Sequence, residues 1–456
     1  MRHKVTLGSV HKGSEAFIIA EHFANKEKSI LYIARDDREI YALQSKLFWL
    51  LPKADILIFR SWDQIPYDNV SPSREIQSER IKTLYQLSVN KQKKIILSSV
   101  NAIIQRTVDQ SFIKKNYVTI FVNQKLNFNH FIQQLISLGY QRTSVVREKT
   151  DFAIRGSIVD IFIVDRKNPL RIDFFDNNIE SIYEFDRLTQ KRLLKIENEK
   201  IYIHPSSELL INDETITLFR KNFREIFSNY RLSQVYNSFS ESILPPGGEQ
   251  FLPFFLEKME TFFNFVNDCQ VIVNSQFNDL LENRIENIND FFKARKQLND
   301  NFYLKPDQLY LSSNETNHYL SKNDLIKFSE FTDEKSKKAN IKKIPNLSSI
   351  RKEIDFDFID KFFNIHSKLK TIIICCRSLG SLDRVHKIIY ENLNISLNHI
   401  KNFQEIKENI NFYITTLEID DAFELGKLIF LNEKSLFGYN FATKEKSIKN
   451  KRFIYR

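Results

Sequence analysis

The sequence predicts an α/β protein: a parallel-sheet domain is interrupted by a small α+β insert and followed by a separate small α/β domain. Short apolar runs alternate with helical stretches in the first 110 residues, and the rhythm changes to closely spaced strands between about 117 and 203. A further alternation follows a polar stretch at 332–350. At about 150 residues per domain, 456 residues also suggest about three domains.

The first region has the strand, helix, strand order of a parallel sheet with covering helices. Its predicted strands are residues 29–34, 55–60 and 94–99, with a helix at 36–50. In the insert we expect a strand at 117–122 and a helix at 128–138 that ends at Gly139. The later predicted strands of the insert are 153–164, 170–175 and 179–185, with a turn at Asp176-Asn177-Asn178 between the last two.

Helical periodicity is predicted from 204 to 310, interrupted by Leu244-Pro-Pro-Gly-Gly248, which neither a helix nor a central strand tolerates. The last region alternates strands at 370–376, 411–415 and 427–431 with a helix at 381–391. The predicted divisions are 1–116, the insert at 117–203, the second part of the first domain at 204–315, a linker at 316–345, the last domain at 346–440 and a basic tail at 441–456.

Composition narrows the classes of function. A net charge of +10 with 42% hydrophobic residues is typical of a globular protein and excludes a disordered or nucleic-acid-coating chain. Only 9 residues are glycine, which disfavours a motor built from several glycine-rich phosphate loops. The 40 phenylalanines, with abundant Lys, Ile and Asn, indicate mutational drift, so an eroded remnant without a present role stays an alternative.

Targeting and metal signals are missing from the sequence. We expect a cytoplasmic protein that contacts no membrane, because neither a signal-peptide core nor an apolar stretch of about 20 residues occurs. Three cysteines, Cys269, Cys375 and Cys376, cannot form a disulfide framework, and no second Cys/His pair has zinc spacing. We therefore predict no metal, no cofactor and no catalytic residues.

A loop of phosphate-binding spacing lies near the N-terminus. Gly8 and Gly13 have the spacing of such a loop, but Ser14 and Glu15 stand where Lys and Ser or Thr would hold the phosphates and magnesium. The Glu15 carboxylate stabilises the start of the following helix and repels a triphosphate. The sequence thus predicts an inactive nucleotide loop, and the acidic segment at 418–421 reads as a solvated turn.

Several blocks in order resemble the N-terminal module of the bacterial transcription-repair coupling factors (Mfd), over almost the whole chain. The blocks are WDQIPYD at 62–68, SP at 71–72, IKTLYQL at 81–87, SSVNAIIQR at 98–106, RGSIVD at 155–160, LRIDFFD at 170–176, IESI at 179–182, FD at 185–186, LPPG at 244–247 and KLIFLNEKSLFG at 427–438.

The resemblance implies a module similar to the excision-repair protein UvrB: a degenerate helicase-like domain, an insert that docks on UvrA, and a last α/β domain of poorly defined role. It implies a non-catalytic adaptor in nucleotide excision repair and transcription-coupled repair, with UvrA as partner. The family's RNA-polymerase-binding, translocase and UvrA-masking domains are not in this sequence, so we expect no polymerase binding and a permanently available docking face. The short connection at 65–71 favours the coupling factors over UvrB as parent.

The predicted docking residues lie on and beside the strand at 170–175. Alternation points Leu170, Ile172 and Phe174 to one face and Arg171, Asp173 and Phe175 to the other. An exposed arginine with an aromatic residue is the composition of a binding hot spot. Arg155 on the preceding strand joins them across the sheet, and Arg155, Arg171 and Phe175 match the family's UvrA-contacting residues. Alternatively, Phe175 tucks inward and Arg171 pairs with Asp173 or Asp186.

Two further functions are compatible with the sequence. Lysine runs at 91–94 and 444–456, with a pI of about 9.1, could neutralise phosphates and bind double-stranded DNA weakly. No aromatic residues interleave with them, which favours the alternative of solvated charge runs in a lysine-biased sequence. An ATP-dependent DNA enzyme that uses the altered loop is the other alternative.

Overall fold

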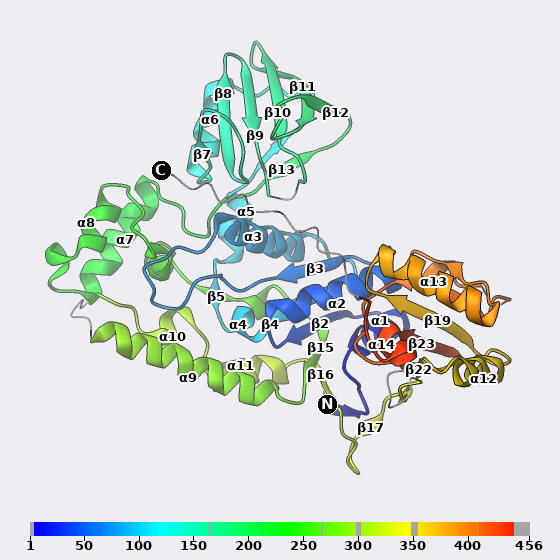
Figure 1. Ribbon diagram of the computed structural model, residues 1–456. Coiled ribbons are helices and arrows are strands. Elements are labelled where there is room, and N and C mark those ends of the chain that lie inside the picture. The colour runs from blue at the N-terminus through cyan, green and yellow to red at the C-terminus, as the bar shows by residue number, and fades with distance from the viewer. Residues whose placement is uncertain are drawn as a thin grey trace, which may run out of the picture. The chain divides into compact units, whose positions relative to one another are not determined.

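The computed structural model describes residues 4–441 except 165, 267, 298–301, 348–353 and 408. The chain divides into two compact units (Figure 1). Their described parts are 29–40 and 56–325 in the first unit, and 4–28, 41–55 and 326–441 in the second, apart from those gaps. Helices and sheets occur in both units, which confirms the predicted α/β class.

A parallel sheet runs through the first unit. Its strands are β15 (Cys269–Asn274), β2 (Ser29–Ala34), β4 (Ile95–Ser99) and β3 (Ile56–Phe59), in that spatial order. Their largely continuous apolar sequences suit strands that are covered on both faces. Strand β15 corrects the prediction of helical periodicity on both sides of the Pro-Pro-Gly-Gly interruption between 204 and 310, because a short apolar run alone does not distinguish a buried strand from a helix.

Helices and short turns complete the body of the first unit. Their starts are capped: the Ser73 side chain accepts from the Ile76 N–H, and Asn212 forms a capping box with Thr215. The elements are α2 (Asp37–Leu50, of which the residues from Tyr41 on lie in the second unit), α3 (Arg74–Val89), α4 (Val100–Ile103), β5 (Arg106–Thr107), α5 (Gln110–Lys115), α7 (Asp213–Ile226), η1 (Tyr230–Leu232), α8 (Gln234–Ser240), η2 (Gly248–Phe254), β14 (Glu260–Thr261), η3 (Phe262–Asn264), α9 (Phe277–Lys296), α10 (Pro306–Leu309) and α11 (Ser313–Ser321).

The insert at 117–203 is a sheet with one helix on its inner face. Six strands pair in the order β12 (Arg192–Ile196), β11 (Asn178–Phe185), β10 (Leu170–Phe175), β9 (Ile158–Ile161), β8 (Asp151–Arg155) and β7 (Gln141–Arg142). Helix α6 (Phe128–Ser137) buries Phe131, Ile132 and Leu135 against the inner face. Strands β6 (Val118–Ile120) and β13 (Ile201–Ile203) pair at the two chain crossings into the body.

The strand predicted at 153–164 is two strands. Gly156 and Ser157 form a turn, with Gly156 at a φ of 61°, and β8 and β9 pair antiparallel on either side of it. By contrast, β10 has the predicted bounds, and the turn before β11 places Asp176 and Asn177 at positive φ as expected of a hairpin. The split changes which residues face one another across the sheet.

The second unit contains the last α/β domain together with N-terminal segments. Its sheet has the order β18 (Ile341–Lys343), β22 (Phe423–Leu425), β23 (Leu428–Asn432), β19 (Thr371–Cys376), β21 (Phe412–Thr416) and β20 (Asn398–His399). Helix α1 (Glu15–Asn25) packs on it through Phe17, whose ring centre lies 4.9 Å from Phe423 and 4.6 Å from Phe430. The other elements are β1 (Lys4–Gly8), β16 (Asp324–Phe328, whose first residues lie in the first unit), β17 (Lys337–Lys338), α12 (Phe356–His366), α13 (Leu379–Leu393), η4 (Phe403–Glu405) and α14 (Glu433–Phe437).

The segment predicted as a linker, 316–345, carries the end of α11 and strands β16, β17 and β18. The basic tail at 441–456 lies outside the described residues, apart from Phe441. The domain limits taken from the sequence remain predictions.

Candidate functional site

The outer face of the insert's sheet holds the predicted docking residues. Along β10 the side chains alternate as predicted: Leu170, Ile172 and Phe174 are buried, whereas Phe175 is exposed. The register places Arg155 opposite Ile158 and Ile158 opposite Asp173, so these three residues form one row across the sheet. Arg155 and Phe175 therefore share the outer face, with β9 between their strands.

Phe175 is the exposed aromatic side chain of this face. Its exposed fraction is 72%, whereas that of the adjacent Phe174 is 5%. Phe174 is held inward by Phe128 and Phe131, whose ring centres lie 5.2 and 5.8 Å from its own. Because a strand alternates its side chains, anchoring Phe174 forces Phe175 outward. The alternative in which Phe175 tucks inward is wrong.

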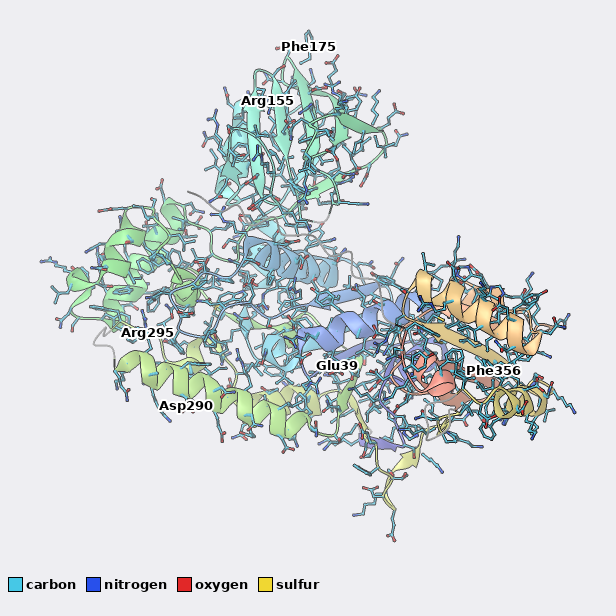
Figure 2. All side chains as sticks on the ribbon, viewed as in Figure 1. Glu39, Arg155, Phe175, Asp290, Arg295 and Phe356 are labelled. Carbon is cyan, nitrogen blue, oxygen red and sulfur yellow. The ribbon has the colours of Figure 1, made fainter. Side chains whose placement is uncertain are left out.

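Arg155 ends β8 at the turn beside Gly156. Its side chain is exposed, and in the described part of the chain its guanidinium has no ion-pair partner. Two strand spacings and two residues along the strand put its Cα about 12 Å from that of Phe175. Figure 2 shows both side chains toward the same end of the insert. A cation and an aromatic ring are thus presented together to solvent.

Arg171 faces outward but is largely covered. Its Nε and Nη2 donate to the two carboxylate oxygens of Asp160 at 2.7 and 2.8 Å, and Nη1 donates to the Gln190 carbonyl at 3.3 Å. The guanidinium lies 4.7 Å from the centre of the Phe185 ring. The side chain is 13% exposed and that of Asp160 is 1% exposed. The hydrogen bond to Asp160 raises the pKa of Arg171, so its charge is fixed.

This arrangement corrects two expectations about Arg171. It is not a freely exposed cation, and its carboxylate partner is Asp160, not Asp173 or Asp186. The turn at Gly156 accounts for the difference, because β9 then runs beside β10 and places Asp160 directly opposite Arg171. Asp173 instead accepts from Ser181 at 2.7 Å and from Arg192 at 2.8 Å.

Exposed leucines on and before the edge strand of the same sheet were not predicted from the sequence. Leu193 and Leu194 on β12 have exposed fractions of 54% and 64%, and Leu188 in the preceding turn has 82%. Leucines within this largely polar segment give no local signal of exposure, because the exposure of Leu193 and Leu194 depends on β12 being the last strand of the sheet.

The glycine-spaced loop before α1 is closed by the chain's own carboxylates. The Gly13 N–H donates to Glu15 Oε2 at 2.7 Å, and the Ser14 hydroxyl donates to the His11 carbonyl at 2.6 Å, with Ser14 fully buried. Glu15 thus occupies a backbone donor that would face a phosphate in a working loop. As predicted, a carboxylate lies in this loop at the position where a triphosphate would need a hydrogen-bond donor.

A second carboxylate also reaches this loop. Gly13 has a φ of 92°, and a Cβ there would lie 3.0 Å from the Asp420 backbone nitrogen and 3.1 Å from Asp420 Oδ2. Lys46, whose side chain is 7% exposed, has its Nζ 3.6 Å from Asp420 Oδ2. Asp420 is therefore more than part of a solvated turn, and no local pattern predicts a contact between residues some 400 positions apart.

Other chemistry finds little support in the described residues. There, no group of three or more His, Cys, Asp or Glu side chains could hold a metal ion. Cys269, Cys375 and Cys376 are buried and form no disulfide bond among the described residues, and burial raises the pKa of the Cys375 and Cys376 thiols. None of the helices in the described ranges is both long and apolar enough to cross a bilayer.

Comparisons with known proteins match the insert and then almost the entire chain. Residues 118–209 match the UvrB interaction domain. The transcription-repair-coupling factor of Rickettsia bellii is 30% identical over 428 residues, which are 92% of this chain and 37% of that protein.

The corresponding proteins of Haemophilus influenzae and Escherichia coli are each 30% identical, over 72% and 59% of this chain and over 28% and 23% of their own lengths. The chain therefore spans well under half the length of these relatives. These matches confirm the predicted resemblance: the chain is similar to the N-terminal part of the bacterial transcription-repair coupling factors, and its insert matches the UvrB interaction domain.

Proposed function

We propose that this chain is a non-catalytic DNA-repair adaptor that recruits UvrA through the outer face of its insert, in nucleotide excision repair and in its transcription-coupled branch. The observation that carries the proposal is the exposure of Phe175 on the same face as Arg155, which has no ion-pair partner among the described residues, on a domain that matches the UvrB interaction domain. An exposed aromatic ring with a nearby arginine supplies apolar area and a directed charge, which are the components of an interface hot spot.

Arg171 supports this surface from beneath in the proposal. Its bonds to Asp160 and to the Gln190 carbonyl tie β10 to β9 and to the turn after β11. The face that UvrA contacts then keeps its shape without a ligand, which reduces the entropy lost on binding.

The test is a calorimetric titration of UvrA into the full chain and its variants. We expect Arg155→Ala with Phe175→Ala to weaken binding by at least about 30-fold, since a hot-spot residue contributes about 2 kcal/mol or more. Arg142→Ala and Phe331→Ala are matched controls, because they remove an exposed arginine of the same insert and an exposed aromatic of the other unit. Wild-type affinity in the double variant would refute the proposal.

An ATP-dependent enzyme is the competing function, and the loop geometry argues against it. Because Glu15 already accepts from the Gly13 N–H, we expect millimolar Mg-ATP to leave the midpoint of thermal unfolding unchanged within about 1 °C, as linkage requires of a ligand that does not bind. A P-loop ATPase measured alongside supplies the positive control. An increase of several degrees would restore the enzyme hypothesis.

Double-stranded DNA remains a weak second partner in this proposal. One lysine of the run at 91–94 is not available to phosphates: Lys94 is 3% exposed, and its Nζ donates to the Asn90 and Gln92 carbonyls at 2.6 and 2.8 Å. The second run lies in the tail, outside the described residues. Any binding through the remaining lysines would be non-specific and strongly dependent on salt.

The eroded-remnant alternative predicts poor cooperativity of folding. Against it, one large polar pair in the core is matched: Arg80 and Glu208 are both fully buried, and Arg80 Nε donates to Glu208 Oε1 at 2.8 Å. Thr83 and Ser98 likewise donate to the Ile58 and Phe59 carbonyls. A chain drifting without selection would lose such matched pairs first, because an unpaired buried polar group costs about 1–3 kcal/mol.

A further inference from the structure

A cavity of about 1000 Å³ lies in the first unit, in the region of the Pro-Pro-Gly-Gly segment. Its walls come from the end of α7, the turn η1, α8, residues 243–251, and the residues at and beyond the end of α9. The volume is at the upper end of the range of about 300–1,000 Å³ usual for ligand pockets. The UvrA-docking proposal gives this cavity no role.

The lining carries one kind of charge. Of the described residues that line the cavity, none is Asp or Glu, and Arg295 is the charged side chain among them. Neutral donors and acceptors surround it, including Asn229, Gln234 and Gln250. A cavity without carboxylates and with one guanidinium favours an anionic ligand over a cationic one.

Arg295 is held in place and keeps donor capacity. Its Nη2 donates to Asn69 Oδ1 at 2.6 Å, and its guanidinium lies 5.7 Å from the centre of the Tyr303 ring. Its Nε is shielded from solvent and has no hydrogen-bond acceptor among the described residues. Figure 2 shows Arg295 at the end of α9. A buried donor of this kind calls for an acceptor supplied from outside.

The backbone that carries Asn69 is conformationally strained. Tyr67 has a φ of 65°, although an aromatic residue rarely adopts this region, and Gly247 has a φ of 71°. A Cβ at Gly247 would lie 2.4 Å from the Asp68 carbonyl oxygen, and the Gly247 N–H donates to Ser71 Oγ at 3.1 Å. Strained residues of this kind concentrate at ligand-binding positions, where the surrounding structure fixes them.

We propose that this cavity binds a nucleotide unit, with its phosphate at Arg295 and its base beside Phe302 and Tyr303. A guanidinium matches a phosphate in charge and in the direction of its donors. Aromatic rings stack on any base, and side-chain amides and hydroxyls can pair with base edges. A peptide that pairs along a sheet edge is disfavoured, because the described lining contains no strand.

The nucleotide unit has two sources of the same chemistry: a free mononucleotide and single-stranded DNA. Both are tested with the full chain. Binding of labelled oligo(dT) is followed by fluorescence anisotropy at low and high salt, and binding of dTMP by calorimetry. Preference for the oligonucleotide with a steep dependence on salt identifies a strand, whereas equal affinity per nucleotide identifies the free form.

We expect Arg295→Gln and Tyr303→Leu each to weaken nucleotide binding by at least about tenfold. Lys296→Gln is the matched control, since it removes the same charge from the next position of α9, outside the cavity lining, and we expect less than about a twofold change. Asn229→Asp places a carboxylate in the lining at an exposed position that folding tolerates, and it should also weaken binding.

The proposal is overturned if the wild-type chain binds neither oligo(dT) nor dTMP, or if Lys296→Gln loses as much affinity as Arg295→Gln. The outcome is independent of the proposed adaptor function, because the three cavity variants should retain wild-type affinity for UvrA, and the Arg155 and Phe175 variants should retain nucleotide binding.

Discussion

Replacing Arg80 with alanine is expected to lower the free energy of unfolding of the first unit by about 3–5 kcal/mol, because it leaves the carboxylate of Glu208 buried without a cation. Both side chains are fully buried, and Arg80 Nε lies 2.8 Å from Glu208 Oε1. The Trp62 indole donates to the other carboxylate oxygen at 2.8 Å, and this single neutral donor would remain. Arg80 also packs over the Phe59 ring at 4.3 Å, so alanine loses that contact as well.

Urea unfolding followed by tryptophan fluorescence measures this effect. The chain has two tryptophans, Trp49 and Trp62, which lie in different units. A Trp49→Phe background therefore makes Trp62, beside the mutated pair, the reporter of the first unit. Lys149→Ala is the control: its partner is the exposed Glu75, and such a surface pair contributes about 0–1 kcal/mol. The prediction is contradicted if Arg80→Ala lowers the free energy of unfolding by no more than Lys149→Ala does.

The second large effect is expected at Arg171. Arg171→Ala should destabilise the insert by about 2–3 kcal/mol, because Asp160 is 1% exposed and would lose two charge-assisted hydrogen bonds. Arg171→Lys keeps the charge but cannot form both bonds in the same geometry, so it should lie between alanine and wild type. Thermal unfolding of each variant gives the order.

A double variant at Arg171 and Asp160 tests whether Arg171 supports the docking face or contacts UvrA directly. In Arg171→Ala with Asp160→Ala no buried charge is left, so we expect much of the stability to return and UvrA affinity to stay within about threefold of wild type. If Arg171 contacts UvrA directly, the double variant folds normally and still loses affinity. Stability and binding measured on the wild type, Arg171→Ala, Asp160→Ala and the double variant complete a double-mutant cycle for the pair.

The sequence was sufficient where one local pattern decides the structure. The alternation along 170–175 predicted the bounds of β10 and the outward direction of Phe175, because anchoring every second residue in a core leaves the others outside. The two hairpin residues Asp176 and Asn177 also adopt the backbone that their type favours.

Features that depend on a partner strand could not be predicted in this way. The pattern at 153–164 predicts one strand because Gly156 and Ser157 interrupt it only briefly, so it does not predict that Asp160 lies opposite Arg171. Strand β15 was not predicted for a related reason, because it is a strand only through its pairing with β2. The hydrogen bond from Arg171 to the Gln190 carbonyl, in the turn at 186–190, likewise depends on tertiary contacts.

The loop at residues 8–15 was predicted in its chemistry but not in its surroundings. Local reasoning identified the acidic Glu15 as incompatible with phosphate, and the carboxylate does take a loop N–H. That Asp420 approaches Gly13 follows only from how the second unit folds.

The carboxylate of Glu15 on the Gly13 amide has a thermodynamic consequence for the living cell. Under the proposed adaptor function, a loop whose Gly13 N–H is already taken by Glu15 binds no triphosphate, so the folded population of this unit would not depend on the supply of adenine nucleotides. Starvation or a fall in the energy charge would then leave the abundance of properly folded chain unaffected, whereas a nucleotide-stabilised relative would lose part of its stability under the same conditions.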